Sequence, residues 1–342
     1  MISLQKIKNI LAQQKPEEVE RLAREANQIT QHYFGRAISL YAPVYISNYC
    51  SSHCTYCGFH VHNRIDRMKL TPDQMHKEMS HIAGSGIENI LILTGESYKA
   101  TPLAYLKEAV EIAKQYFSSI SLEVHPMEEA EYRELFEAGV DGIAIYQETY
   151  HRQRYAQVHL SGKKKDYDYR RSAPERIARA GIRQISMGIL LGLADDVGED
   201  LYELFEHLRW MEKNFPGVEY SLSFPRLRPI KGLGFEPCSV TDLTLIKVIC
   251  LTRICFPRVG INLSTRENAQ LRNRALDLGI TKISAASKTS VGGYTAENPE
   301  ELDPQFDIQD ERSVDEIVQM LKHRKFDPVF TDWRRIENES AA

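Results

Sequence analysis

The stretch CSSHCTYCGF, residues 50–59, places three cysteines within eight positions, and no fourth cysteine lies close by. Thiolates bind zinc or iron–sulfur clusters, but a structural zinc ion usually takes four protein ligands, commonly in two separated pairs. Three neighbouring cysteines therefore predict a metal centre that keeps one coordination position open. A zinc site completed by His53 or His60, or a chance grouping of buried cysteines, is the alternative.

The cysteine stretch follows the first of eight short apolar runs. These runs span residues 42–47, 87–94, 120–124, 142–146, 184–191, 219–224, 261–264 and 280–285. Helical patterns separate them at residues 72–83, 102–116, 127–138, 174–180, 199–214, 241–255 and 268–278. Strands that alternate with helices indicate a parallel sheet with right-handed crossovers.

Eight such repeats predict an α/β fold, a (β/α)8 TIM-type barrel, which typically needs roughly 250 residues. The alternative, an open doubly wound sheet, would need a glycine-rich phosphate turn after its first strand, where this chain has cysteines. We expect an N-terminal helical extension at residues 1–40, the barrel at 41–295 and a C-terminal tail packed on the barrel at 296–342. The tail begins with an acidic loop, residues 296–311, and continues with a short helix at residues 314–323.

Composition excludes several classes of protein. The chain has 342 residues, is 42% hydrophobic and carries a formal net charge of −4, so no large basic field favours nucleic-acid binding. The basic run Lys163–Lys165 is typical of a solvated loop. The N-terminus lacks the apolar core of a signal peptide, and no apolar stretch is long enough to span a bilayer. We therefore expect a cytoplasmic protein whose six cysteines are thiols or metal ligands.

Polar residues follow the predicted strands one after another. In a barrel of this type, the carboxyl ends of the strands form the rim where chemistry collects. The rim should carry residues 48, 94–96, 125, 147–149, 223–228, 264–267 and 287–288. Their joint occurrence predicts one shared pocket, with the cysteine stretch as its first rim loop.

The spacing Cys-x3-Cys-x2-Cys, with Tyr56 before the last cysteine, resembles the signature of the radical S-adenosylmethionine (SAM) superfamily. The resemblance implies that Cys50, Cys54 and Cys57 hold a [4Fe-4S] cluster whose fourth iron binds the amino and carboxylate groups of SAM. Reductive cleavage of SAM would then give methionine and a 5'-deoxyadenosyl radical.

The resemblance extends over residues 41–333. This part of the sequence is similar to the aromatic amino acid lyase branch of the superfamily, in particular the 2-iminoacetate synthase family. The segments that carry it are residues 45–50, 63–65, 93–96, 146–150, 223–229, 263–267, 287–289 and 292–294. It implies cleavage of the Cα–Cβ bond of L-tyrosine to 2-iminoacetate (dehydroglycine) and p-cresol, for synthesis of the thiamin thiazole. A lyase for another aromatic amino acid such as tryptophan, or a non-catalytic iron–sulfur protein, is the alternative. Because no cysteine follows Cys255, we do not expect the second cluster of the relative that makes CO and cyanide.

The resemblance also implies roles for single residues in cofactor binding. Gly95 and Glu96 match the motif after the second strand that lies near the amino group of SAM. Glu148 and Arg170 match residues that contact SAM, the arginine at its carboxylate, although Arg170 stands in a charged run and could lie on the surface. Tyr56 belongs to the same cofactor-binding set.

An amino acid substrate needs a fixed cation for its carboxylate, which arginine binds in a bidentate way that lysine cannot reproduce. Arg266, after the seventh strand, is the first candidate, and Tyr45 and Ser223 resemble further pocket positions. Arg226 and Arg228 alternate along an extended segment, so only one should point inward, and either could form a structural ion pair.

The resemblance implies two protein partners. The imine product hydrolyses in water, so direct transfer to a thiazole synthase is expected, and a reduced flavodoxin or ferredoxin type protein would supply the electron.

Overall fold

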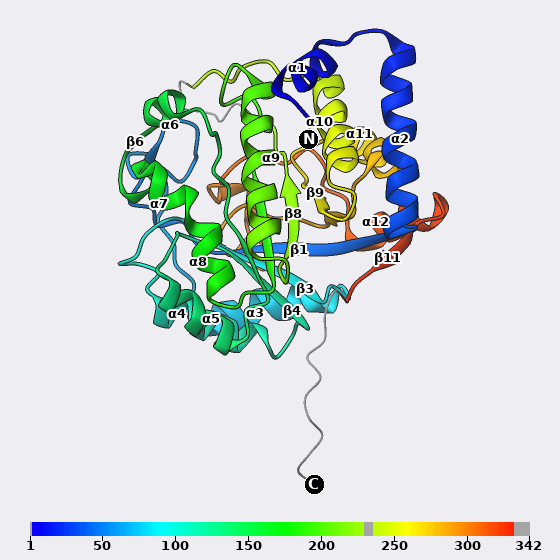
Figure 1. Cartoon of the computed structure of the whole chain (residues 1–342). Coiled ribbons are helices and arrows are strands. Elements are labelled where there is room, and N and C mark those ends of the chain that lie inside the picture. The colour runs from blue at the N-terminus through cyan, green and yellow to red at the C-terminus, as the bar shows by residue number, and fades with distance from the viewer. Residues whose placement is uncertain (1, 229–234, 332–342) are drawn as a thin grey trace.

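A computed structural model describes residues 2–228 and 235–331, and its centre is a closed ring of eight parallel strands (Figure 1). Strand β1 hydrogen-bonds to β3, the order then runs through β4, β5, β7, β8, β9 and β10, and β10 returns to β1. Leu40 of β1 stands opposite Ile283 of β10 at this closure. The bounds are β1 Ala37–Ser47, β3 Asn89–Thr94, β4 Ser119–Glu123, β5 Gly142–Ala144, β7 Gln184–Gly188, β8 Glu219–Ser223, β9 Gly260–Leu263 and β10 Lys282–Ser284. The predicted barrel is confirmed.

Helices surround the ring at the predicted places. They are α3 Pro72–Gly84, α4 Leu103–Ala113, α5 Glu129–Ala138, α8 Ala173–Arg179, α9 Val197–Asn214, α10 Asp242–Cys255 and α11 Ala269–Ala275, the last extended by the 3-10 turn η2 Leu276–Leu278. Local sequence sets several of the starts: Thr71 caps α3 in a reciprocal capping box with Gln74, and Thr241 caps α10.

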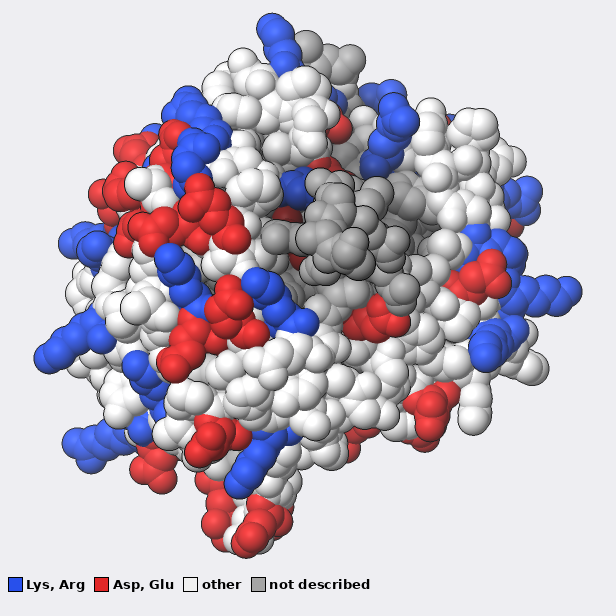
Figure 2. All heavy atoms as spheres, turned by 90° about the horizontal axis from the view of Figure 1, so that it is seen from below, with Lys and Arg blue, Asp and Glu red and all other residues white. Residues whose placement is uncertain are grey.

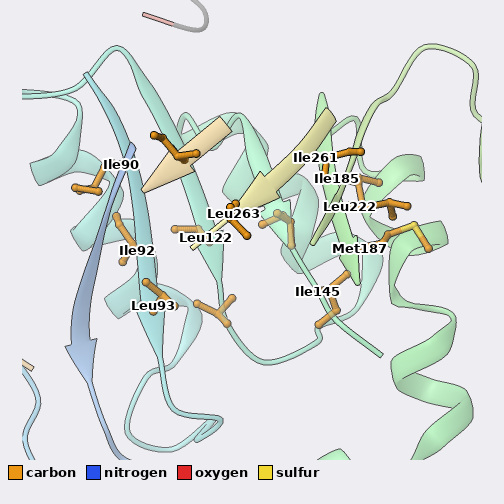
Figure 3. Close-up of a cluster of buried hydrophobic side chains, with 14 of the residues drawn as sticks. Ile90, Ile92, Leu93, Leu122, Ile145, Ile185, Met187, Leu222, Ile261 and Leu263 are labelled. Atoms are coloured by element: carbon orange, nitrogen blue, oxygen red, sulfur yellow. The ribbon is translucent and has the colours of Figure 1, made fainter. Parts of the chain in front are cut away.

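Successive side chains along each strand point alternately toward the surrounding helices and toward the inside of the barrel. Residues such as Ile92, Leu122 and Ile185 face the helices and are fully buried. Figure 3 shows buried hydrophobic side chains along the strands, among them Ile92, Leu122 and Ile185. The alternate positions face the inside of the barrel and include many polar residues: Ser121, Glu123, Gln184, Ser186, Ser221, Ser223, Asn262 and Ser264. Period-two alternation thus puts the chemistry inside the ring.

One insertion between β5 and α8 was not predicted. It contains α6 Arg152–Val158, β6 His159–Ser161, the 3-10 turn η1 Lys163–Lys165 and α7 Tyr167–Arg171. Strand β6 pairs antiparallel with β2, His53–Cys54, inside the cysteine stretch. These elements are too short to show a periodicity in the sequence, and they hold the cysteine loop in place.

The N-terminal helices and the described part of the C-terminal segment pack on the barrel. Helices α1 Leu4–Ala12 and α2 Pro16–Phe34 lie beside α9 and α10 (Figure 1), and Lys247 of α10 donates to the carbonyl of Leu11 at 2.8 Å. β1 begins at Ala37, before the expected residue 42. The segment expected from residue 296 is described up to residue 331. It holds the 3-10 turn η3 Pro299–Glu301, α12 Val314–His323, and β11 Asp327–Val329, which pairs with β1.

The surface shows no single dominant charge on the face seen in Figure 2, where groups of basic and acidic side chains alternate. In the described part of the chain, none of the helices is both long enough and apolar enough to cross a membrane.

Candidate active site

A cavity of about 930 Å³, part of it open to solvent, lies inside the barrel at the carboxyl ends of the strands. It brings together residues from distant parts of the chain, in particular Cys57 of the cysteine loop and Arg266 after β9. Its lining includes Tyr45, Tyr56, Glu123, Tyr146, Glu148, Lys164, Ser223, Gln305 and Phe306. The shared pocket predicted at the rim is therefore present.

The cysteine loop is held between two glycines of neighbouring segments. A Cβ atom on Gly95 would lie 2.4 Å from the carbonyl oxygen of Tyr49, and one on Gly162 would lie 2.5 Å from that of Ser51. The Ser51 amide donates to the carbonyl of Glu96 at 2.9 Å. The residue after β3 and the insertion before α7 thus fix the backbone of the loop from two sides.

Without a metal, burial favours the neutral thiol form of the three cysteines of the loop. Burial raises the pKa of Cys50 to about 11 and raises that of Cys54 and Cys57, with Lys164 opposing the rise at the latter two. A metal cation favours the thiolate form that such a site otherwise disfavours. Cys54 packs in an apolar cluster with Val158, Leu190, Leu193 and Leu227.

The arrangement gives no support to zinc. Within residues 2–228 and 235–331, no three His, Cys, Asp or Glu side chains surround a single metal-ion position. In an iron–sulfur cluster each thiolate binds a different iron, so its sulfur atoms stand further apart than the ligands of one ion. Cys50, Cys54 and Cys57 fit a [4Fe-4S] cluster, which they would hold at the mouth of the barrel.

Four buried charges form a network beside the cysteine loop. Arg170 donates to Glu96 at 2.6 Å and to the carbonyl of Tyr146 at 2.7 Å, and Lys164 donates to Glu148 at 2.8 Å. Burial alone would raise the pKa of Glu96, but Arg170 and Lys164 outweigh it and hold that pKa below its usual range. Oxygen Oε2 of Glu96 is buried without a hydrogen-bond partner. An unsatisfied acceptor at this position fits the amino group of SAM.

For two members of this network the structure decides a point: it removes the surface alternative for Arg170 and contradicts the prediction for Lys164. Arg170 is buried, so it does not lie on the surface, and the prediction that residues 163–165 form a solvated loop is wrong for Lys164, whose side chain is only 12% exposed. Glu148 has a φ of 70°, a left-handed conformation that is uncommon outside glycine. Backbone strain of this kind concentrates at functional sites.

Tyr56 lies between the cysteine loop and the insertion. Its hydroxyl is 2.8 Å from Nε2 of the buried His159, whose pKa burial lowers to about 2, so the imidazole is neutral. The imidazole is also 2.9 Å from the carbonyl of Tyr155 through Nδ1. Because that nitrogen must then carry the proton, Nε2 accepts from the Tyr56 hydroxyl.

Arg266 is presented to the cavity by an aromatic ring. Its guanidinium lies 3.4 Å from the ring centroid of Phe306, and among the described residues no carboxylate is paired with it. The Tyr45 hydroxyl donates to Oε1 of Gln305 at 2.8 Å. Ser223, at the end of β8, lines the same cavity.

Arg226 and Arg228 do not line this cavity. Arg226 makes a bidentate pair with the buried Glu267 and a 2.8 Å pair with Asp242, and Arg228 donates to Glu267 at 3.0 Å. Both side chains therefore belong to an ion-pair network outside the cavity. The sequence analysis had kept a structural ion pair as the alternative for each of them.

The cavity residues that the sequence interpretation missed include the polar and aromatic side chains of Glu123, Lys164, Gln305 and Phe306. An acid at the end of an apolar run could have indicated Glu123. Gln305 and Phe306 come from the acidic C-terminal segment, and nothing in its sequence pattern indicates that it reaches the barrel mouth.

A second cavity, of about 1200 Å³, occupies the opposite end of the barrel. It shares Tyr41, Leu91 and Tyr146 with the first cavity and contains none of the predicted site residues. The cysteine loop therefore identifies the smaller cavity as the candidate active site.

Comparisons with known proteins identify the family of the chain. Residues 44–208 match the model of the radical SAM superfamily, and residues 223–327 match the Biotin and Thiamin Synthesis associated domain. The chain is 42% identical to 2-iminoacetate synthase of Escherichia coli K12 over 316 residues, which cover 92% of this chain and 83% of that protein. It is 28% identical over 256 residues to 3-methylornithine synthase of Methanosarcina barkeri, covering 74% of this chain and 70% of that one.

A solved structure gives the same result for the whole fold. The X-ray structure of the FeFe-hydrogenase maturase HydG from Carboxydothermus hydrogenoformans superposes with a TM-score of 0.89 at 31% identity, covering 96% of this chain and 76% of that one. The fold, the cysteine loop and the extent of these similarities lead to one assignment. The chain belongs to the 2-iminoacetate synthase family of radical SAM lyases.

Proposed function

We propose that this protein cleaves the Cα–Cβ bond of L-tyrosine to 2-iminoacetate and p-cresol and so supplies a precursor of the thiamin thiazole. One observation carries the proposal: a single cavity contains both Cys57 of the cluster loop and the three substrate candidates Arg266, Tyr45 and Ser223. The relatives named 2-iminoacetate synthase support it across nearly the full length of the chain.

The residues around the cavity divide into a cofactor side and a substrate side. When bound, the [4Fe-4S] cluster and SAM supply the radical that removes a hydrogen atom from the substrate. On the cofactor side, Oε2 of Glu96 would accept from the amino group of SAM, and Glu148 and Arg170 would contact the rest of the molecule. On the substrate side, the Arg266 guanidinium would bind the tyrosine carboxylate in a bidentate way.

The C-terminal segment would exclude water from this reaction. Gln305 and Phe306 line the cavity at the mouth of the barrel. The carbonyl oxygen of Gln305 is so close to Gly58 that a Cβ atom added to Gly58 would lie 2.8 Å from it. Because the imine product hydrolyses, a covered pocket and transfer to a thiazole synthase suit its chemistry. A flavodoxin or ferredoxin type protein would reduce the cluster.

The reaction can be tested with protein reconstituted with iron and sulfide and incubated with a reductant, SAM and each aromatic amino acid in turn. We expect p-cresol and 5'-deoxyadenosine with L-tyrosine, and neither product after Cys54→Ala, which removes a cluster ligand. Cys255→Ala, outside the loop, is the matched control and should keep the activity. Indole products from tryptophan in place of p-cresol would refute the substrate, and four bound irons without any deoxyadenosine would refute the enzyme.

A further inference from the structure

Glu123 is an acid without a counter-charge in the active site. It is the last residue of β4, and it lines the cavity together with Glu148. Glu148 is bound by Lys164, and Glu96 beside the cysteine loop is bound by Arg170. In the described part of the chain, no ion pair or hydrogen bond reaches the Glu123 carboxylate.

Arg266 in the same cavity is a cation that lacks a carboxylate partner within residues 2–228 and 235–331, as Glu123 is an acid that lacks a cation. Its guanidinium contacts the ring of Phe306 and has no carboxylate partner among the described residues. The two side chains act on each other, since Arg266 lowers the pKa of Glu123 and Glu123 raises that of Arg266. One unpaired cation and one unpaired anion thus face the same space, although an unpaired buried charge is costly.

An α-amino acid carries the complementary pair of charges on a single carbon atom. Its carboxylate can bind Arg266, and its ammonium group can then bind Glu123. Building on the proposed function, we infer that Glu123 binds the ammonium group of the substrate and accepts one proton from it before the hydrogen atom is removed. One N–H bond breaks, its electron pair stays on nitrogen, and the proton goes to a carboxylate oxygen, which leaves a neutral amine and a neutral carboxyl group.

The surroundings of Glu123 suit this task. Burial raises its pKa to about 7, Glu148 adds to the rise, and Lys164, Arg266 and Arg170 oppose it. Glu123 in turn contributes to the raised pKa of three nearby tyrosines, Tyr41, Tyr45 and Tyr146. A carboxylate with a pKa close to the working pH is a better proton acceptor than an ordinary glutamate.

The pH dependence of kcat/KM for L-tyrosine tests the inference in the holoenzyme with Glu123→Gln. In the wild type, the ionised Glu123 is the competent form, so kcat/KM should rise as the pH passes through about 7. The glutamine variant cannot accept a proton, and we expect its kcat/KM near pH 7 to fall about 100-fold or more. In the variant, the increase of kcat/KM with pH should shift to the higher pH at which the substrate ammonium group loses its proton, because the free amine is then present in solution.

A binding measurement separates a role at the ammonium group from a role in shaping the pocket. Glu123→Gln should weaken binding of L-tyrosine to the SAM-loaded protein by about 10-fold or more, because a charged hydrogen bond is lost. It should not weaken binding of 3-(4-hydroxyphenyl)propanoate, which lacks the amino group. Equal losses for both compounds, or an unchanged pH profile, would overturn the inference.

Two controls make the outcome unambiguous. Glu219→Gln removes a carboxylate from the cavity at the other end of the barrel and should leave the pH profile unchanged. Since burial raises the pKa of Glu123, the ionised form destabilises the fold above pH 7, and Glu123→Gln should unfold at no lower temperature than the wild type at pH 8. A wild type that forms no p-cresol would count against the proposed function itself, whereas an active wild type with an equally active variant would count against Glu123 alone.

Discussion

At the scale of single residues, the surroundings of Arg266 suit the role proposed for it at the substrate carboxylate. Stacking on Phe306 orients the planar guanidinium toward the cavity, and the absence of a paired carboxylate among the described residues leaves its donors available. The nearby arginines Arg226 and Arg228 are occupied by Glu267. Burial lowers the pKa of Arg266, as expected for a cation held out of water until an anion arrives.

Arg266→Lys should therefore weaken the use of tyrosine while sparing the cluster. Lysine cannot offer two parallel donors, and the loss of one charged hydrogen bond, about 1.5–3 kcal/mol, predicts a rise in KM of about 10- to 100-fold. Iron content and the ultraviolet–visible spectrum of the cluster should not change. Arg228→Lys, outside the cavity, is the control. A variant at Arg266 with wild-type KM would remove this residue from the carboxylate site.

The residue scale also shows where sequence reasoning stops. Arg266 and the cysteines could be proposed from sequence because their motifs are specific, whereas Lys164 was taken for a surface residue within a run of three lysines. Only the fold shows that its neighbours Lys163 and Lys165 are exposed while Lys164 pairs with Glu148 inside. Burial of one charge in a run depends on the path of a short irregular segment, which local composition does not determine.

At the scale of elements, the position of the cysteine loop depends on close backbone contacts. Gly95 follows β3 directly, and its backbone touches that of Tyr49 just before Cys50. No residue with a side chain fits there without moving the loop, because the obstacle is backbone and not a flexible side chain. The glycine of the Thr-Gly-Glu sequence is thus a steric requirement, apart from the cofactor role proposed for this segment.

Gly95→Ala should lower the iron content of the reconstituted protein. The added methyl group must push the loop away from β3, which would misplace Cys50. Iron and sulfide content, together with thermal unfolding of the apoprotein, measure the effect. Gly84→Ala at the end of α3, where a Cβ atom meets nothing within 4 Å, is the matched control and should change neither quantity. Full cluster occupancy in Gly95→Ala would show that the loop adapts.

Strands and long helices were predictable from sequence because their periodicity repeats over many residues. All eight barrel strands and the helices between them lie where the pattern indicates, with β1 starting earlier than expected. Strand β6 and helix α7 were missed because segments of three to five residues carry no measurable period. The barrel was thus predictable, and the parts that hold the cysteine loop were not.

At the scale of the whole molecule, the C-terminal segment is tied to the barrel by a buried ion pair. Asp310 is fully buried, pairs with Arg272 of α11 and binds Arg312 at 2.6 Å. Burial would raise the pKa of Asp310, but the two arginines outweigh it and hold the pKa below its usual range. Asp310 lies a few residues after Gln305 and Phe306, which line the cavity. Its ion pairs therefore hold this segment against the barrel.

Asp310→Asn should destabilise the protein by about 3–5 kcal/mol, because it leaves a buried arginine without its counter-charge. A depressed pKa means that the ion pair contributes its full stability above the unfolded-state pKa of about 3.9, and loses it as the pH falls through the folded-state value. Urea unfolding at several pH values should thus show the largest difference near neutrality and convergence in acid. Asp307→Asn, exposed in the same segment, should change stability by less than about 0.5 kcal/mol. A pH-independent difference would contradict the role of the pair.

The pairing of β1 with β10 imposes an order on biosynthesis. The cysteines follow the first strand, but the ring closes only with the eighth strand, and residues 304–306 complete the mouth later still. At ribosomal speeds of about 5–20 residues per second, the nascent chain waits roughly 10–50 s between making the thiols and making the strand that encloses them. During that interval the thiols belong to an incomplete sheet, where they can be oxidised or can bind the wrong metal. The topology of the barrel therefore requires that the cell protects these cysteines during synthesis.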